Sequence, residues 1–119
     1  DAAVPAIEAL PSVVKALEGS SCIVLLDSGV RWGSDVVRAL AYGAKGVLVG
    51  RPVLWGLAVN GQGGVEHCLE LLRNETARTL ALCGCSCPGD AGRWLLSSDH
   101  RPPDGIMSRS NLAHYRKFI

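Results

Sequence analysis

The chain has 119 residues, of which 48% are hydrophobic, and its formal net charge is +1. This length suits one small domain, and the balanced charge excludes the broad basic excess of a protein whose main partner is nucleic acid. The longest apolar run, Cys22–Leu26, and the shorter run Val47–Val49 are far shorter than the ~20 residues of a membrane span. Five cysteines, an odd number, argue against a secreted disulfide framework and favour a reducing compartment.

The chain begins with a predicted helix and a predicted buried strand. Apolar residues recur at spacings of three and four over Ala6–Leu17, which indicates a helix. Pro11 interrupts this pattern, so it lies either in a turn before the helix or in the helix's first turn. Cys22–Leu26 is a continuous apolar run, typical of a strand covered on both faces, and Cys22 is expected to be a buried small hydrophobe.

A second predicted strand follows a helix and completes a crossover unit. Gly33–Lys45 is expected to be a helix that Ser34 caps, with Asp35 favourably placed in its first turn. Gly46–Val49 is a second short apolar run. Residues 22–50 therefore predict a β-α-β unit with parallel strands and a right-handed crossover.

The second half of the chain predicts one good helix and then loses its periodicity. Pro52–Val59 is expected to be a short helix or turn, and Asn60–Gly64 a flexible break. Val65–Leu82 has the clearest apolar stripe of the chain and is predicted to be a helix. Cys83–Ile119 is rich in Gly, Pro, Ser, Asp and Arg without a sustained period, so we expect an irregular tail.

Each predicted strand ends in small residues followed by an arginine. Asp27–Arg31 follows the first strand, and Gly50–Arg51 follows the second. Parallel strands present their carboxyl ends at one edge, so the two guanidinium groups can meet at one phosphate, while the small residues let backbone N–H groups approach it. The alternative is that both are solvated arginines on surface turns. Asp27 could accept a hydrogen bond from a ligand hydroxyl or from Arg31, or could cap a local turn.

Other chemistry-bearing residues favour structural interpretations. Cys83, Cys85 and Cys87 are close in sequence, but a closed zinc site needs four ligands, usually as two spaced pairs, so incidental thiols are favoured and no metal is expected. No histidine follows a predicted strand with an orienting carboxylate, so no catalytic residue is assigned. Trp32 and Trp55 are expected to be packing residues.

Several motifs together resemble the FMN-dependent α-hydroxy-acid oxidases, particularly the glycolate oxidase and 2-hydroxy-acid oxidase branch. Leu26–Val36 resembles the family signature D-G-G-V-R-x-G-T-D-V, and Ala39–Ala44 and Val49–Pro52 continue the match. Trp55–Ala58 and Leu80–Cys85 are similar to that branch. The resemblance covers roughly residues 1–86.

The resemblance implies an α/β fold, the C-terminal part of a TIM (β/α)8 barrel with about two strands and three helices, from helix 6 to helix 8. Residues 1–86 would be this barrel portion, and residues 87–119 a divergent, disordered tail. The implied cofactor is FMN. The residues implied to contact FMN, mainly at its ribityl chain and phosphate, are Asp27, Ser28, Gly29, Val30, Arg31, Gly50 and Arg51. Ser28 stands where the family usually has a second glycine.

The implied activity is oxidation of an (S)-2-hydroxy acid to a 2-oxo acid with reduction of O2 to H2O2. The family's general-base histidine and substrate-binding arginine belong to a motif upstream of Asp1, so the 119 residues alone are expected to be inactive. The family also implies a tetramer and a peroxisomal location. Lys117–Ile119 is not the peroxisomal Ser-Lys-Leu tripeptide, so the alternative location is the cytoplasm.

Two other functions stay open as alternatives. One is a non-catalytic FMN- or phosphate-binding remnant, such as a pseudogene product, and the other is another phosphate-binding barrel such as IMP dehydrogenase.

Overall fold

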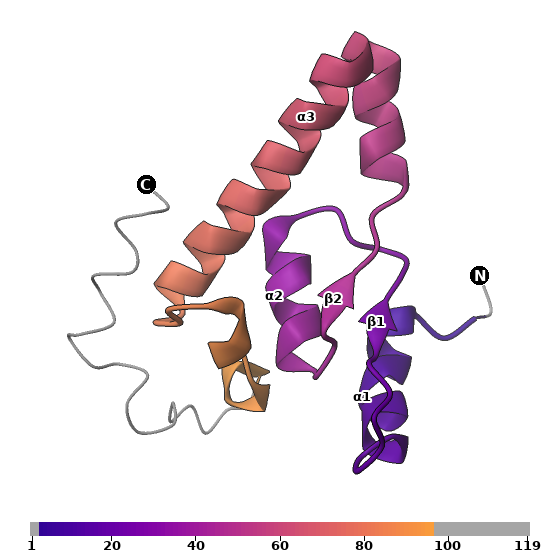
Figure 1. Cartoon of the computed structure of the whole chain (residues 1–119), viewed down its shortest axis with the longest axis vertical. Helices are drawn as coiled ribbons and strands as arrows, with labels where there is room; N and C mark the ends of the chain where they lie inside the picture. Colours follow the sequence, from indigo (N-terminus) through magenta and orange to yellow (C-terminus); the bar gives the residue numbers. More distant parts are fainter. Residues whose placement is uncertain (1–2, 97–119) are drawn as a thin grey trace.

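The computed structural model describes residues 3–96 and contains two strands and three α-helices, as the sequence predicts. The elements follow one another along the chain as Figure 1 shows. They are α1 (Ala6–Ala16), β1 (Leu25–Leu26), α2 (Gly33–Ala41), β2 (Gly46–Val47), α3 (Arg51–Leu82) and two short 3-10 helices, η1 (Pro88–Asp90) and η2 (Arg93–Leu96).

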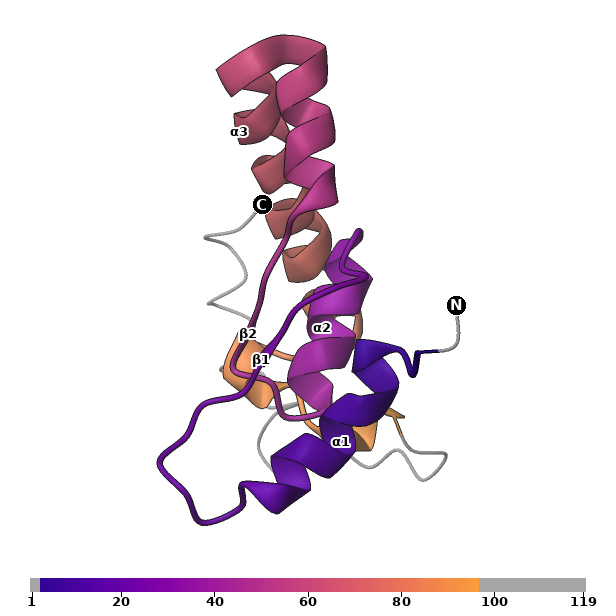
Figure 2. The ribbon, with the colours of Figure 1, turned by 90° about the vertical axis from the view of Figure 1, so that its right-hand side faces the viewer.

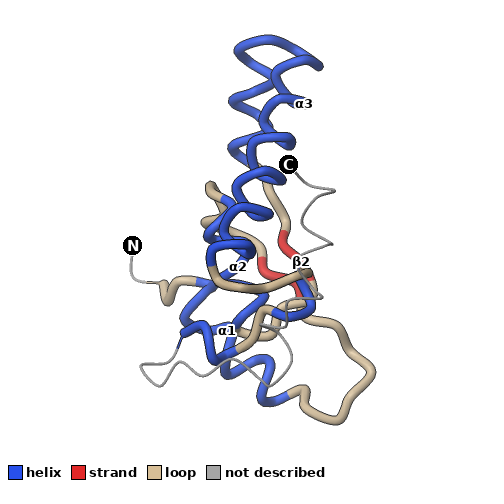
Figure 3. Tube along the Cα trace, turned by 90° about the vertical axis from the view of Figure 1, so that its left-hand side faces the viewer, coloured by secondary structure: helices blue, strands red, loops and turns tan. Residues whose placement is uncertain are grey.

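The two strands pair in parallel through a crossover that contains α2, which confirms the predicted β-α-β unit. Leu25 pairs with Gly46 and Leu26 with Val47, and the Leu48 N–H donates to the Leu26 carbonyl at 2.8 Å. Figure 3 shows the two strands, in red, beside α2. Because both strands run the same way, the loops that follow them leave the same edge of the sheet.

Both strands are shorter than predicted, and the expectation for Cys22 is wrong. The first strand begins only at Leu25, and Cys22 lies exposed in the loop before it rather than buried. Ile23 is 72% exposed, and Leu25 and Leu48 are also exposed. Leu26, in contrast, is buried, so within residues 3–96 one face of the sheet is covered and the other is not, although the composition of the apolar runs anticipates two covered faces.

One core cluster joins α1, the sheet and the end of α2. Its buried members are Leu10, Leu26, Val30, Ala39 and Ala44. Pro11 lies inside α1, neither before the helix nor in its first turn, because Ala6 already begins the helix. The buried Leu10 beside it shows that packing of the apolar face outweighs the hydrogen bond that a proline removes.

The α3 segment consists of two helical arms joined by a kink. Asn60 and Gly61 have non-helical backbone angles, at the place where the sequence predicts a break between two helices. The chain reverses direction at the kink (Figure 2), and beyond it the two arms diverge (Figure 1). Near the kink the backbones of Gly56 and Gly64 approach so closely that a Cβ atom on either would collide with the other. The break is therefore a tight turn rather than an extended linker.

The helix α2 packs against the second arm of α3 through Gly33. The Gly33 N–H donates to Glu75 Oε2 at 2.8 Å, and a Cβ atom at Gly33 would collide with the backbone of Glu75 and Thr76. The helix begins at Gly33 with Trp32 as its N-cap, so Ser34 is not the cap that the sequence predicts. A side-chain carboxylate from α3 instead satisfies the first N–H of α2.

The first residues of the expected irregular tail fold back onto α2. A second core cluster is formed by Val37, Leu80 and Cys85, with Trp94 and Leu95 packed against it. The Asp90 carboxylate accepts N–H groups from Ser86 at 2.7 Å and Cys87 at 3.0 Å. Burial opposes ionisation of Asp90, but these hydrogen bonds prevail and lower its pKa. The predicted disorder from residue 87 is therefore not found over residues 87–96, and the rest of the tail lies outside the described residues.

Within residues 3–96, no helix combines the length and apolar character that crossing a bilayer requires.

The Gly33→Ala substitution tests the contact between α2 and α3. We expect a loss of about 1–3 kcal/mol in the free energy of unfolding, measured by urea titration, because the added methyl group forces the two backbones apart. The control is Ser34→Ala on the exposed neighbouring position, which should change stability by less than about 0.5 kcal/mol because Ser34 is not the cap. Equal losses in the two variants would contradict this interpretation.

Candidate phosphate-binding site

The loops after β1 and β2 line one shared cavity of about 210 Å³. Both arginines singled out in the sequence line it, so the structure brings Arg31 and Arg51 to the same place. All seven expected contact residues are among those lining the cavity: Asp27, Ser28, Gly29, Val30, Arg31, Gly50 and Arg51. The cavity is smaller than the ~300–1,000 Å³ of a typical site for a drug-sized ligand, so it suits one end of a larger ligand, such as a phosphate group.

The first loop has a sharply turned backbone. Ser28 and Gly29 have φ angles of 83° and 84°, in the left-handed region that glycine adopts readily and serine does not. The Asp27 Oδ1 atom accepts the Ser28 N–H at 2.7 Å, and no ion pair joins Asp27 to Arg31 in the described part of the chain. Asp27 therefore caps its own turn, which is one of the alternatives that the sequence leaves open.

Asp35 fixes the end of this loop against the start of α2. Its Oδ2 atom accepts the N–H groups of Arg31 and Trp32, both at 3.0 Å. Because these bonds hold the Arg31 backbone, only the side chain of Arg31 remains to be oriented. The sequence places Asp35 near the helix N-terminus, but its bonds to Arg31 and Trp32 depend on the turn at Ser28 and Gly29.

The second loop leads directly into the N-terminus of α3. Gly50 is the N-cap residue, Arg51 is the first helical residue, and Pro52 follows it. The N–H groups at a helix N-terminus carry a partial positive charge, which stabilises a bound phosphate. A Cβ atom at Gly50 would meet no heavy atom within 4 Å, so space remains open for a ligand beside the backbone.

Trp55 orients the Arg31 side chain. The guanidinium Cζ atom of Arg31 lies 5.7 Å from the centre of the Trp55 ring, within the range of a cation–π interaction. Trp55 itself is 52% exposed, and Trp32 is 63% exposed, so neither is the packing residue that the sequence predicts. The contact was not predictable because it depends on how the first turn of α3 leaves the sheet.

The cysteine tract does not form a metal site in the described residues. No group of three or more His, Cys, Asp or Glu side chains there could hold a metal ion. Cys85 is buried, Cys83 is half-buried and Cys87 is exposed. Burial, then the neighbouring Cys83, Asp90 and Cys87, raises the pKa of Cys85 to about 11, so this thiol stays protonated at neutral pH. Its place in the core next to Val37 and Leu80 indicates a packing role.

Comparison with known proteins identifies the family. The sequence profile of the FMN-dependent dehydrogenases matches residues 1–98. The chain belongs to this family, whose cofactor is FMN.

Individual relatives are oxidases of 2-hydroxy acids. An L-lactate oxidase from Nostoc sp. is 54% identical over 86 residues, which are 72% of this chain and 23% of the relative. 2-Hydroxyacid oxidase 1 from Homo sapiens is 54% identical over 83 residues, 69% of this chain and 22% of the relative. A mandelate oxidase variant with a monooxide FMN adduct superposes with a TM-score of 0.73 at 52% identity, over 78% of this chain and 29% of that one. The chain thus spans about a quarter of the length of these relatives.

The geometry of the cavity fits the phosphate end of FMN. The two arginines can provide charge-assisted hydrogen bonds, and the N-terminus of α3 supplies a third positive element. Asp27 is the one carboxylate that lines the cavity, and it is engaged by the Ser28 N–H. The donors of the cavity therefore suit a dianionic phosphate group, and the Asp27 carboxylate suits hydroxyl groups next to that phosphate.

Alkylation rates test the assignment of the cysteines. With iodoacetamide at pH 8, exposed Cys22 and Cys87 should react first and Cys85 last, because Cys85 is buried and its pKa is about 11. Peptide mass spectrometry over time gives the order, and denatured protein, in which the differences should disappear, is the control. Early modification of Cys85 in the native chain would contradict its burial.

Proposed function

We propose that this chain provides the phosphate-binding edge of a flavin-dependent (S)-2-hydroxy-acid oxidase. The observation that carries the proposal is the convergence of Arg31 and Arg51 on one cavity at the carboxyl ends of adjacent parallel strands. Phosphate sites of TIM barrels commonly lie on the loops after strands 7 and 8, and β1 and β2 would be those strands. The similarity to lactate, mandelate and glycolate oxidases supports the substrate class.

In this proposal the residues of the chain bind and orient the cofactor. Arg51 holds the phosphate through its guanidinium group and its backbone N–H, and Arg31 reaches it from the other loop. The next N–H groups of α3 are not available, because Pro52 has none and those of Val53 and Leu54 donate to the Gly50 carbonyl. Gly29 brings its backbone N–H group to the ribityl chain. Asp27, whose Oδ1 atom accepts the Ser28 N–H, accepts from a ribityl hydroxyl group through its second oxygen. Bound FMN supplies the two-electron acceptor for conversion of the hydroxy acid to the oxo acid, with O2 reduced to H2O2.

We further propose that turnover requires the remaining strands of the barrel. A TIM barrel contains eight strands, whereas the described residues contribute two. His67, the histidine in the described part of the chain, is exposed on α3 and does not line the cavity. The full enzyme would be located in peroxisomes, as the name of a rice relative, a peroxisomal (S)-2-hydroxy-acid oxidase, suggests. Its assembly as a tetramer is a proposal that rests on the family resemblance alone.

Substitution of Arg51 tests the proposed function. Arg51→Gln should weaken FMN binding by about tenfold or more, because a hydrogen bond to a charged group contributes about 1.5–3 kcal/mol. Quenching of flavin fluorescence on titration of the chain measures the affinity. Arg73→Gln, on an exposed part of α3, is the matched control and should bind FMN as the unsubstituted chain does. Unchanged affinity in Arg51→Gln would overturn the proposal.

A second experiment tests whether turnover requires the remaining strands. If the chain binds FMN, addition of glycolate or a longer 2-hydroxy acid should release no H2O2 from the 119 residues alone. Release of H2O2 would show that they suffice for turnover and would contradict the need for the other strands.

Substitution of Trp55 tests its role in positioning Arg31. Trp55→Leu removes the aromatic face and should weaken FMN binding about two- to fivefold, since an exposed cation–π contact contributes about 0.5–1 kcal/mol. Trp55→Phe keeps an aromatic face and should retain most of the affinity. In an Arg31→Gln background Trp55→Leu should have no further effect, so an equal loss in both backgrounds would show that Trp55 does not act through Arg31.

A further inference from the structure

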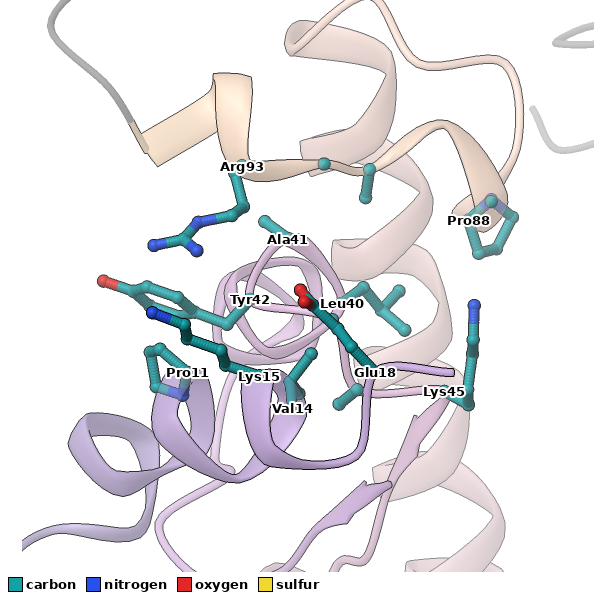
Figure 4. A pocket seen from close by; sticks show the side chains of 15 residues that line it. Pro11, Val14, Lys15, Glu18, Leu40, Ala41, Tyr42, Lys45, Pro88 and Arg93 are labelled. Atoms are coloured by element: carbon teal, nitrogen blue, oxygen red, sulfur yellow. The ribbon is translucent and has the colours of Figure 1, made fainter. Parts of the chain in front are cut away.

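A second cavity, of about 360 Å³, lies at the opposite end of α2 from the phosphate site. It is formed by the end of α1, the residues from the end of α2 to the start of β2, and the segment that contains η1 and η2 (Figure 4). Residues 40–45 line this cavity and precede β2, whereas Leu48 and residues 50–52 line the phosphate site and follow β2. The two cavities therefore open at opposite edges of the sheet.

Cationic groups from separate parts of the chain line this cavity. Lys15 comes from α1, Lys45 from the turn before β2, and Arg93 from η2. Figure 4 shows Lys15 and Arg93 reaching toward the hydroxyl end of Tyr42, which belongs to the C-terminus of α2. Glu18 is the one carboxylate in the lining, and it stands between Lys15 and Lys45 in the same view.

None of these charged groups is neutralised within the described residues. Lys15, Lys45 and Arg93 form no ion pair there, and the Tyr42 hydroxyl has no hydrogen-bond partner. Like charges around one cavity repel each other, and this repulsion is relieved when an anion binds between them. The arrangement also leaves strong donors without an acceptor on the side formed by Lys15, Tyr42 and Arg93.

The dipoles of the helices explain only part of this cluster. Lys15 lies in the last turn of α1, and Lys45 follows the end of α2, where cations stabilise the partial negative charge of a helix C-terminus. Arg93 is not at the end of either helix. It is brought there by the segment that packs on Val37 and Leu80 through Trp94 and Leu95. The apolar residues Val14 and Leu40 lie on the opposite wall from Arg93 and offer a surface to a hydrocarbon group.

We propose that this cavity is a second ligand site, which binds a small organic anion, a carboxylate or a phosphate monoester, between Lys15, Tyr42 and Arg93. The anionic group accepts from the guanidinium, the ammonium and the hydroxyl, and the hydrocarbon part lies against Val14 and Leu40. Glu18 limits the site to ligands whose charge lies on the Arg93 side. The proposal is independent of FMN binding, because the two sites share no lining residue.

NMR titration of the 15N-labelled chain tests the proposal and separates the two anion classes. Inorganic phosphate and succinate are added in separate titrations, and amide shifts are expected at residues 41–45 and 91–93 with at least one of them. The probe that binds more tightly identifies the class of ligand. Shifts confined to residues 28–31 and 50–51, where the first site lies, or no saturable shift at all, would overturn the proposal.

Two substitutions of opposite effect give the decisive comparison. Arg93→Gln removes a donor and should weaken binding about tenfold or more, whereas Glu18→Gln removes a repelling charge and should strengthen it severalfold. Both side chains are exposed, so the fold should persist, and Arg73→Gln serves as the control for general charge. If Arg93→Gln does not fold, the gain in Glu18→Gln decides alone. Equal affinity in Glu18→Gln and the unsubstituted chain would contradict an anion bound beside Glu18.

Discussion

The parallel pairing of β1 with β2 determines where the functional groups of this chain lie. The register that places Leu25 opposite Gly46 and Leu26 opposite Val47 aligns the carboxyl ends of the strands. Each strand is followed at once by small residues and an arginine, so Arg31 and Arg51 line one cavity although α2 separates them in the sequence. A shift of the register by one residue would turn the strand side chains to the opposite faces and would disrupt this arrangement.

Contacts from the helices keep the first loop in place. Asp35 accepts the backbone N–H of Arg31, and Trp55 lies against its guanidinium group. Glu75 accepts the first N–H of α2, and the absence of a side chain at Gly33 allows the two helices to meet there. The phosphate site therefore depends on α3 twice, once through Arg51 and Trp55 in its first turns and once through Glu75 in its second arm.

The local part of this architecture could be predicted from the sequence, and the tertiary part could not. The apolar run before Asp27 and the glycine loops predict the crossover and the position of both arginines. The prediction that Cys22 is buried was wrong because the strand begins only at Leu25 and leaves Cys22 in the exposed loop before it. The prediction that Ser34 caps α2 was wrong because the helix begins earlier, with the extended Trp32 as its N-cap. The bond from Gly33 to Glu75 joins residues far apart in the sequence, and no local pattern indicates it.

The central claim is that the paired loops recognise a phosphate group rather than the flavin ring alone. Comparison of FMN with riboflavin, which has the same ring and ribityl chain but no phosphate, tests this claim most directly. The account predicts that the chain binds FMN at least about tenfold more tightly than riboflavin at low salt, and that added salt narrows the difference. Equal affinity for the two flavins would contradict it.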